Sequence, residues 1–427
     1  MTAYTDSRTA PLPVLRARPP WRHTLIALSV RNYRLFAISH FVAMTAAWIQ
    51  RVAQDWLVLE LSGSASAVGI TVAAQFAPML LLGMVGGLIA DRFPKRNLLL
   101  ATQTLSAILS ATLAVLALTG TIQVWHIYVL ALLSGLVTVV DNPARQVFVG
   151  EVVGQKHLSN AISLNASIFQ LGGLIGPAVS GALLLSVGAG WSFAINAVAC
   201  LVVVGILLSL RTEHLMPAPA APRSKGQLRE ALAYIGRKPE ILWTLVMVGV
   251  LAVFAFTMPV LLASFADDVF HSGPGGYGLY NAVLAGGALV GAIASTRRAS
   301  LTLRTVIVAG GLFAVLQTVG GTMPVELAFC VALFAVGVLN LLFITGANSL
   351  VQLSSNPAIR GRVMSVYILL LLGGQAIGGP VMGWIVESFG AHTGMVVSGI
   401  VPAVAAAVIA LLLWRRRAAV RAAVPAA

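Results

Sequence analysis

Twelve apolar runs of roughly 20 residues follow one another along this 427-residue chain, and a run of about that length spans the hydrocarbon core of a bilayer as a helix. Charged residues make up only 9% of the sequence, against about 25% in a typical soluble domain. A transmembrane barrel would show short segments of alternating polarity instead. The sequence therefore predicts an all-α integral membrane protein.

The expected spans can be placed from the apolar runs alone. We expect them at 34–58, 66–90, 97–118, 124–141, 160–185, 191–210, 241–266, 276–295, 302–320, 325–349, 362–386 and 393–414. Five of these spans contain proline, which membrane helices tolerate because neighbouring groups re-satisfy the freed carbonyls. The prolines are Pro78, Pro177, Pro259, Pro380 and Pro402.

The basic residues lie on alternate connections between these spans. They account for 26 of the 27 lysines and arginines, on the two tails and on the connections after every second span. The other connections carry acids on or beside them, namely Glu60, Asp267, Asp268, Glu326 and Glu387. Cytoplasmic loops of membrane proteins are rich in Lys and Arg. We therefore expect a multi-pass protein of the cytoplasmic (inner) membrane with both termini in the cytoplasm. The net charge of +14 then reflects topology, and we expect no nucleic-acid partner.

The chain divides into two similar halves. We expect a basic N-terminal tail (1–33), a six-helix bundle (34–210), a central loop (211–240), a second six-helix bundle (241–414) and a C-terminal tail (415–427). The central loop is proline-rich, with a short amphipathic segment at 227–237. Gly176-Pro177 recurs as Gly379-Pro380, 203 residues later, and Gly87 recurs as Gly291 after 204 residues. Parallel repeats of this kind are typical of secondary transporters.

Three motifs resemble one family. The turn Gly87-xxx-Asp91-Arg92-x-x-Lys95-Arg96 is similar to the signature between helices 2 and 3 of the major facilitator superfamily. Gly172-xxx-Gly176-Pro177 resembles the helix 5 motif of its antiporters. Residues 56–64, DRFPKR and DNPARQ look like the bacterial branch of enterobactin exporters and macrolide efflux proteins. The resemblance covers roughly residues 30–415. It departs at Pro94, where the family has glycine, and at Ser295, the repeat counterpart of Asp91.

The resemblance implies the major facilitator fold, two six-helix bundles that give alternating access to a site near the membrane midplane. It implies a cytoplasmic latch formed by Gly87, Asp91, Arg92, Arg96, Asp141 and Arg145. It also implies gating Gly-Pro motifs at Gly172, Gly176, Pro177, Gly181, Gly374, Gly379, Pro380 and Gly383. For Asp91, Arg92 and Arg96 the alternative is a solvated turn. Asp141 and Arg145 can form an i,i+4 pair, or Arg145 can reach Asp91, and the alternative to a latch role is an ordinary interfacial ion pair. For the Gly-Pro motifs the alternative is plain packing of small residues.

The pair Arg51 and Asp55 is the most informative feature inside a span. Arg51 is the one base outside the alternate connections, and Gln50 and Gln54 accompany it. Ionisable residues within a membrane usually mark a transport pathway and need a partner, and Asp55 lies one turn away. We expect Asp55 to carry a proton and Arg51 to assist it or to meet an anionic substrate; the alternative is a structural pair reaching the outer interface. His40 is a further coupling candidate or a satisfied core histidine.

Signatures of an enzyme are missing from the sequence. It has no phosphate-binding loop ending in Lys-Ser/Thr and no HExxH, so we expect neither ATP-driven transport nor a metal site. Its two cysteines suggest no disulfide framework. We expect no enzyme activity, no cofactor, and a proton gradient as the energy source.

These observations predict a monomeric secondary transporter in the lipid bilayer that exports a hydrophobic or amphipathic small molecule, such as a drug or a siderophore-like compound, by proton antiport. Two alternatives stay open. One is an importer or facilitator of a polar metabolite on the same fold, and the other is a non-transporting membrane sensor.

Overall fold

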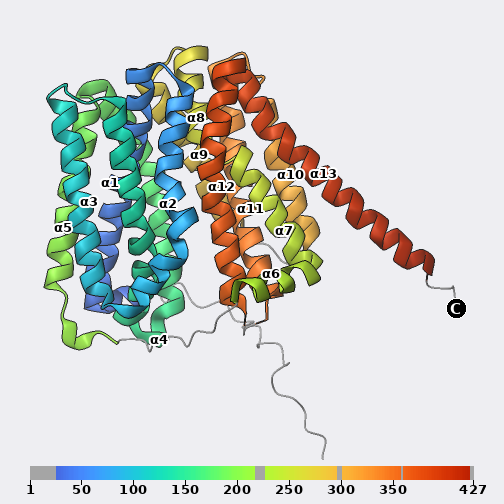
Figure 1. Ribbon diagram of the computed structural model, residues 1–427, viewed down its shortest axis with the longest axis horizontal. Coiled ribbons are helices and arrows are strands. Elements are labelled where there is room, and N and C mark those ends of the chain that lie inside the picture. The colour runs from blue at the N-terminus through green and yellow to red at the C-terminus, as the bar shows by residue number, and fades with distance from the viewer. Residues whose placement is uncertain (1–25, 217–226, 296–300, 357–358, 424–427) are drawn as a thin grey trace, which may run out of the picture.

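The fold is described from a computed structural model, which covers residues 26–216, 227–295, 301–356 and 359–423. These residues form helices and no strand, and most helices run nearly parallel across the molecule (Figure 1). The all-α membrane fold predicted from the apolar runs is confirmed.

The first group of helices ends before residue 211. It comprises η2 (Ile26–Ser29), α1 (Arg31–Ser62), α2 (Ala65–Arg92), α3 (Lys95–Leu118), α4 (Val124–Ser186) and α5 (Ala189–Ser209). Two short helices follow, η3 (Thr212–His214) and α6 (Gln227–Arg237). The second group comprises α7 (Pro239–Phe254), α8 (Met258–Ser264), the π-helical turn η4 (Phe265–Val269), α9 (Gly273–Ser295), α10 (Leu303–Gly320), α11 (Glu326–Ser354), α12 (Arg360–Phe389) and α13 (Ala391–Ala423).

The predicted twelve spans are confirmed. Twelve segments of the described chain are helical, long and apolar enough to cross a membrane. Most ends lie within a few residues of the expected ones; span 1, for example, covers Arg31–Ser62 and span 9 covers Leu303–Gly320. The agreement follows because helix length in a membrane is set by the thickness of the bilayer. The amphipathic segment at 227–237 is helix α6.

One connection and one span differ from the prediction. α4 continues as a helix through the expected loop between spans 4 and 5, with one interruption at Gly154, where φ is 67° and ψ is 173°. Glycine takes this backbone conformation without a Cβ penalty, so the chain turns there. Span 7 is broken at residues 255–257, and Pro259 lies in the first turn of α8 rather than inside a continuous helix.

Successive spans alternate in direction, which defines two ends of the molecule. We call the end where α1, α3 and α12 begin the basic end, because these helices start at Arg31, Lys95 and Arg360. It is the lower end in Figure 1. The opposite end, where Ser64 precedes α2 and Glu387 lies in the last turn of α12, is the acidic end.

The two helix groups meet mainly along two helix pairs, α2 with α12 and α4 with α9, and α1 also contacts α8 and α9. Glycines allow the close approach: a Cβ at Gly379 would lie 2.5 Å from the carbonyl oxygen of Gly69, and one at Gly181 would lie 2.9 Å from the Cα of Gly278. The residue limits of the five predicted segments stay a prediction. Arg297 and Arg298, beside the second copy of the charged turn, lie outside the described residues.

Candidate functional site

Asp55 lies where the two helix groups touch near the acidic end. It is on α1, and its Oδ2 accepts a hydrogen bond of 3.3 Å from the hydroxyl of Tyr277 on α9. Asp55 is 1% exposed and Tyr277 is fully buried. The other carboxyl oxygen, Oδ1, has no hydrogen-bond partner among the described residues. A buried polar atom without a partner is uncommon and calls for an explanation.

Arg51 does not pair with Asp55, which corrects the expectation of a direct ion pair. Its guanidinium carbon lies 5.1 Å from the ring centre of Trp48 and 5.6 Å from that of Phe76 on α2. Although Arg51 and Asp55 are one turn apart on α1, Asp55 is directed to Tyr277 of the other group while Arg51 is held between two rings of its own group. Cation–π contacts of this kind stabilise a desolvated guanidinium.

The remaining candidates on α1 face different neighbours. Gln50 accepts a hydrogen bond of 2.8 Å from Asn196 on α5, so it ties α1 to its own group. Gln54 is 3% exposed, and its Nε2 has no partner in the described chain. His40 is 7% exposed and stacks on Phe36 with ring centres 6.1 Å apart. The Nδ1 of His40 has no partner among the described residues, so the satisfied core histidine is not what the structure shows.

A second contact between the helix groups lies at the acidic end and was not predicted. Oε2 of Glu387 on α12 accepts hydrogen bonds from the Ser64 hydroxyl, at 2.8 Å, and from the Ser66 backbone N–H, at 3.0 Å. Glu387 thus caps the first turn of α2, where free N–H groups attract negative charge. In the sequence, Glu387 indicates only the topology of the chain. Its position opposite the start of α2 is visible only in the tertiary structure.

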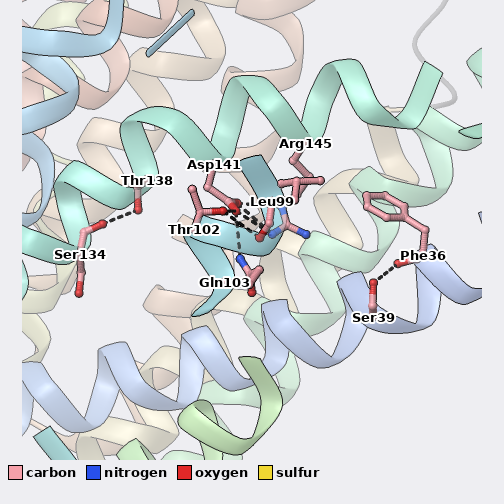
Figure 2. Close-up of polar contacts among 9 residues, drawn as sticks. All are labelled: Phe36, Ser39, Leu99, Thr102, Gln103, Ser134, Thr138, Asp141 and Arg145. Atoms are coloured by element: carbon pink, nitrogen blue, oxygen red, sulfur yellow. Dashed lines mark hydrogen bonds and ion pairs between the residues drawn. The ribbon is translucent and has the colours of Figure 1, made fainter. Parts of the chain in front are cut away.

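Asp141 is the centre of a polar cluster nearer the basic end (Figure 2). It forms an ion pair of 2.9 Å with Arg145, one turn along α4, and accepts hydrogen bonds from Thr102 and Gln103 of α3 at 2.7 and 3.0 Å. Of the arrangements left open, the i,i+4 pair is therefore formed. The two added donors show that Asp141 also joins α3 to α4.

The charged turn between α2 and α3 is fixed by its bases. The Nε and Nη2 of Arg96 donate to the carbonyls of Leu207 and Leu208, at 2.8 and 3.0 Å, and so cap the end of α5. Lys95 forms an ion pair of 3.7 Å with Glu151 of α4, an acid that the sequence analysis overlooked. Asp91 is half-buried in the last turn of α2 and Arg92 is exposed. Their role as a latch stays a prediction.

The glycines of the Gly-Pro motifs serve close helix packing, whereas Gly87 of the charged turn does not. No atom lies within 4 Å of a Cβ built at Gly87, whereas one at Gly86 would overlap Val139. The two Gly-Pro motifs pack partly within their own group: Cβ atoms built at Gly172 and Gly176 meet Met44, Thr45 and Trp48 of α1, and one at Gly374 meets Ala252 of α7. Gly181, Gly379 and Gly383 meet the other group. Pro177 and Pro380 lie inside their helices. Their gating role stays a prediction.

No cluster of three or more histidine, cysteine, aspartate or glutamate side chains that could hold a metal occurs in the described part of the chain. The structure shows instead a buried carboxyl group at the contact of the two helix groups and, one turn along α1, a guanidinium flanked by two aromatic rings. Such groups at a repeat interface are typical of transporter sites.

The fold is that of major facilitator transporters. A bacterial homologue of the human lysosomal transporter Spinster, in an inward-facing and unoccupied conformation, matches with a TM-score of 0.68 and 17% identity over 92% of this chain and 97% of its own. The nucleoside transporter NupG matches with a TM-score of 0.71 and 13% identity, over 90% of this chain and 99% of its own. At these identities the likeness concerns the fold alone.

Sequence comparison places the chain more closely. Residues 23–424 match the model of the transmembrane secretion effector family, and the chain belongs to this family of major facilitator transporters. The enterobactin exporter of Citrobacter koseri is 26% identical over 379 residues, 86% of this chain and 88% of that protein. The enterobactin exporter of Escherichia coli O1:K1 / APEC is 25% identical over 362 residues, 82% and 84% of the two chains. The family resemblance seen in the sequence motifs is thus confirmed.

Proposed function

We propose that this transporter exports a hydrophobic or amphipathic small molecule, drug-like or siderophore-like, in exchange for protons. Export is supported by the family and by relatives that are named enterobactin exporters. The hydrocarbon-like character of the spans, with few charges beyond Arg51, Asp55, Asp141 and Arg145 in their interior, supports an amphipathic rather than a highly polar substrate.

The observation that carries proton coupling is the position of Asp55. It is a carboxyl group on one helix group, hydrogen-bonded to Tyr277 of the other, and buried at their contact. A group that binds a proton at such a contact can bias the two arrangements of the halves, because each ligand shifts an equilibrium by its differential affinity for the two states. Asp55 is therefore the proposed proton carrier.

The energy of a proton gradient suffices for this exchange. One elementary charge crossing the membrane is worth about 2.3 kcal/mol per 100 mV, before any contribution from a pH difference. The proposed working form is a monomer in the cytoplasmic membrane. The alternation of basic connections supports an orientation with both termini in the cytoplasm, so that the basic end faces the cytoplasm.

The test is transport in reconstituted vesicles. We would impose a pH gradient and follow a panel of lipophilic cations and siderophore-like anions, for the wild type and for Asp55→Asn. We expect gradient-driven movement of at least one compound by the wild type and its loss in Asp55→Asn, because an amide cannot carry the proton. Binding of the same compound without a gradient should survive the substitution.

Glu60→Gln is the matched control. Glu60 lies on the same helix, a little more than one turn from Asp55, but is exposed, so its substitution should leave coupled flux intact. Gradient-driven flux that persists in Asp55→Asn would contradict the proposed carrier. Accumulation in the direction opposite to export, in vesicles of known orientation, would contradict the proposed direction.

A further inference from the structure

Arg51 is a charged side chain inside a membrane span that forms no direct ion pair with the described protein, although Asp55 lies one turn away. It lies in the span Arg31–Ser62 and is half-buried. Among the described residues its guanidinium contacts the rings of Trp48 and Phe76 but makes no ion pair and no hydrogen bond. Ionisable groups in membrane spans normally pair with one another or with backbone carbonyls. Its donors are therefore available to a molecule from outside the chain.

The side chains around Arg51 form an aromatic surface. Trp48 lies edge-on to Phe169 of α4, with ring centres 6.1 Å apart and an interplanar angle of 67°. Small residues bring Trp48 onto α4, since a Cβ built at Gly173 would lie 3.5 Å from its ring. Phe169 is 47% exposed and Phe76 is half-buried. Two rings thus contact the guanidinium, and a third, partly exposed ring packs against one of them.

Along α1, this surface lies next to Asp55, which contacts the second helix group. Trp48, Arg51 and Asp55 recur at helical spacing along one face of α1, and Asp55 on that face touches Tyr277 of α9. Arg51 lies one helical turn, about 5.4 Å, from Asp55 toward the basic end. Because Asp55 is 1% exposed beneath Tyr277 and Arg51 is partly exposed, the two groups are accessible to different degrees in this conformation.

We propose that Arg51, with Trp48, Phe76 and Phe169, binds an organic anion with an aromatic body, such as an aromatic carboxylate. This inference deepens the proposed function and rests on it for the claim that the bound molecule is the transported one. A guanidinium presents a planar fork of N–H groups that matches the two oxygens of a carboxylate. The rings of the site would stack on the aromatic part of the same molecule.

The geometry also sets the order in which the organic anion and the proton bind. In the conformation described here the anion site is partly exposed while the carboxyl group of Asp55 is sealed, so the organic anion would enter in this state and the proton in another. An anion leaving the cell and a proton entering it both move down an inside-negative potential.

The test compares one ring system in three charge states. Purified full-length protein in lipid nanodiscs would be titrated by calorimetry, without any gradient, with 2-naphthoate, its neutral amide 2-naphthamide and the cation 2-naphthylmethylammonium. We expect the carboxylate to bind at least tenfold more tightly than the other two. Arg51→Gln should lower naphthoate affinity at least tenfold, and Arg51→Lys should restore it only in part, because lysine lacks the planar fork.

Further variants keep the proposal testable if Arg51→Gln does not fold. Phe76→Leu, which keeps the arginine and removes one ring, should weaken naphthoate binding severalfold. Arg304→Gln, at an exposed arginine of the other group, serves as the control and should have no effect.

Two results would overturn the anion site: equal affinity for naphthoate and naphthamide, or unchanged naphthoate affinity in folded Arg51→Gln. Naphthoate that binds as expected, while no compound of the panel is moved by a gradient, would refute the proposed function and leave the anion site standing. Gradient-driven export of a lipophilic cation together with no binding of naphthoate would refute the anion site and support the proposed function.

Discussion

At the scale of single residues, this protein places ionisable groups in the membrane in two contrasting environments. Asp141 is surrounded by donors from Arg145, Thr102 and Gln103. Asp55, in contrast, has one hydrogen bond and one oxygen without a partner in the described chain. A fully satisfied buried polar cluster makes a fold rigid and specific, whereas a buried polar group without a partner is costly. The two acids are therefore expected to respond differently to substitution.

Removing Asp141 should destabilise the protein. The side chains of Asp141 and Arg145 are 13% and 9% exposed, and breaking a buried pair by removing one partner costs about 3–5 kcal/mol. We expect Asp141→Ala to lower the melting temperature of the detergent-solubilised protein, and Glu213→Gln, at an exposed acid, to leave it unchanged. An unchanged melting temperature with loss of transport would indicate instead that the cluster acts in the transport cycle.

At the scale of helices, close approach rather than side-chain interlocking holds the two groups together. Gly379 of α12 lies against Gly69 of α2, and Gly383 lies against Ala65. Small residues let membrane helices come near enough for backbone contact. A single added methyl group at such a contact pushes the two helices apart. Substitutions at these glycines should therefore change the equilibrium between conformations.

Gly379→Ala should shift this equilibrium away from the described arrangement. The added Cβ would lie 2.5 Å from the carbonyl oxygen of Gly69, which forces α2 and α12 apart at the acidic end. Pulsed electron spin resonance between labels at the exposed residues Glu60 and Phe389 should show a longer mean distance. Gly205→Ala, where no atom lies within 4 Å, is the control. An unchanged distance distribution in Gly379→Ala would contradict this role of the glycine contact.

At the scale of the whole molecule, the acidic end is held by carboxyl groups from both helix groups. Asp55 of the first group accepts from Tyr277 of the second, and Glu387 of the second accepts from Ser64 and Ser66 of the first. Hydrogen bonds to a charged acceptor are roughly twice as strong as neutral ones. These contacts favour the arrangement in which the acidic end is closed.

Glu387→Ala should therefore make the acidic end open more often. In a background without Cys200 and Cys330, the modification rate of Ala65→Cys by a membrane-impermeant maleimide should rise severalfold, because Ala65 is 7% exposed in the closed arrangement. Glu387→Gln, which keeps one acceptor oxygen, should give a smaller rise. Equal modification rates with and without the Glu387 carboxylate would show that this contact does not hold the end closed.

The sequence by itself determined the number of spans, most of their ends and the alternation of basic connections. It also determined the family, through short motifs such as Gly87–Arg96 and Gly172–Pro177. These properties are local: the length of an apolar run and the charge of a connection decide how a segment meets the bilayer, whatever its neighbours are.

Only the tertiary structure decided which groups meet. The contact of Asp55 with Tyr277 joins residues 222 positions apart, and that of Glu387 with Ser64 joins residues 323 apart. The sequence grouped Arg51 with Asp55 because they are one turn apart. In the structure, the rotation of α1 relative to α2 and α9 places Arg51 against aromatic rings and Asp55 against Tyr277. Helix rotation depends on packing between distant segments, and no pattern within a single segment records it.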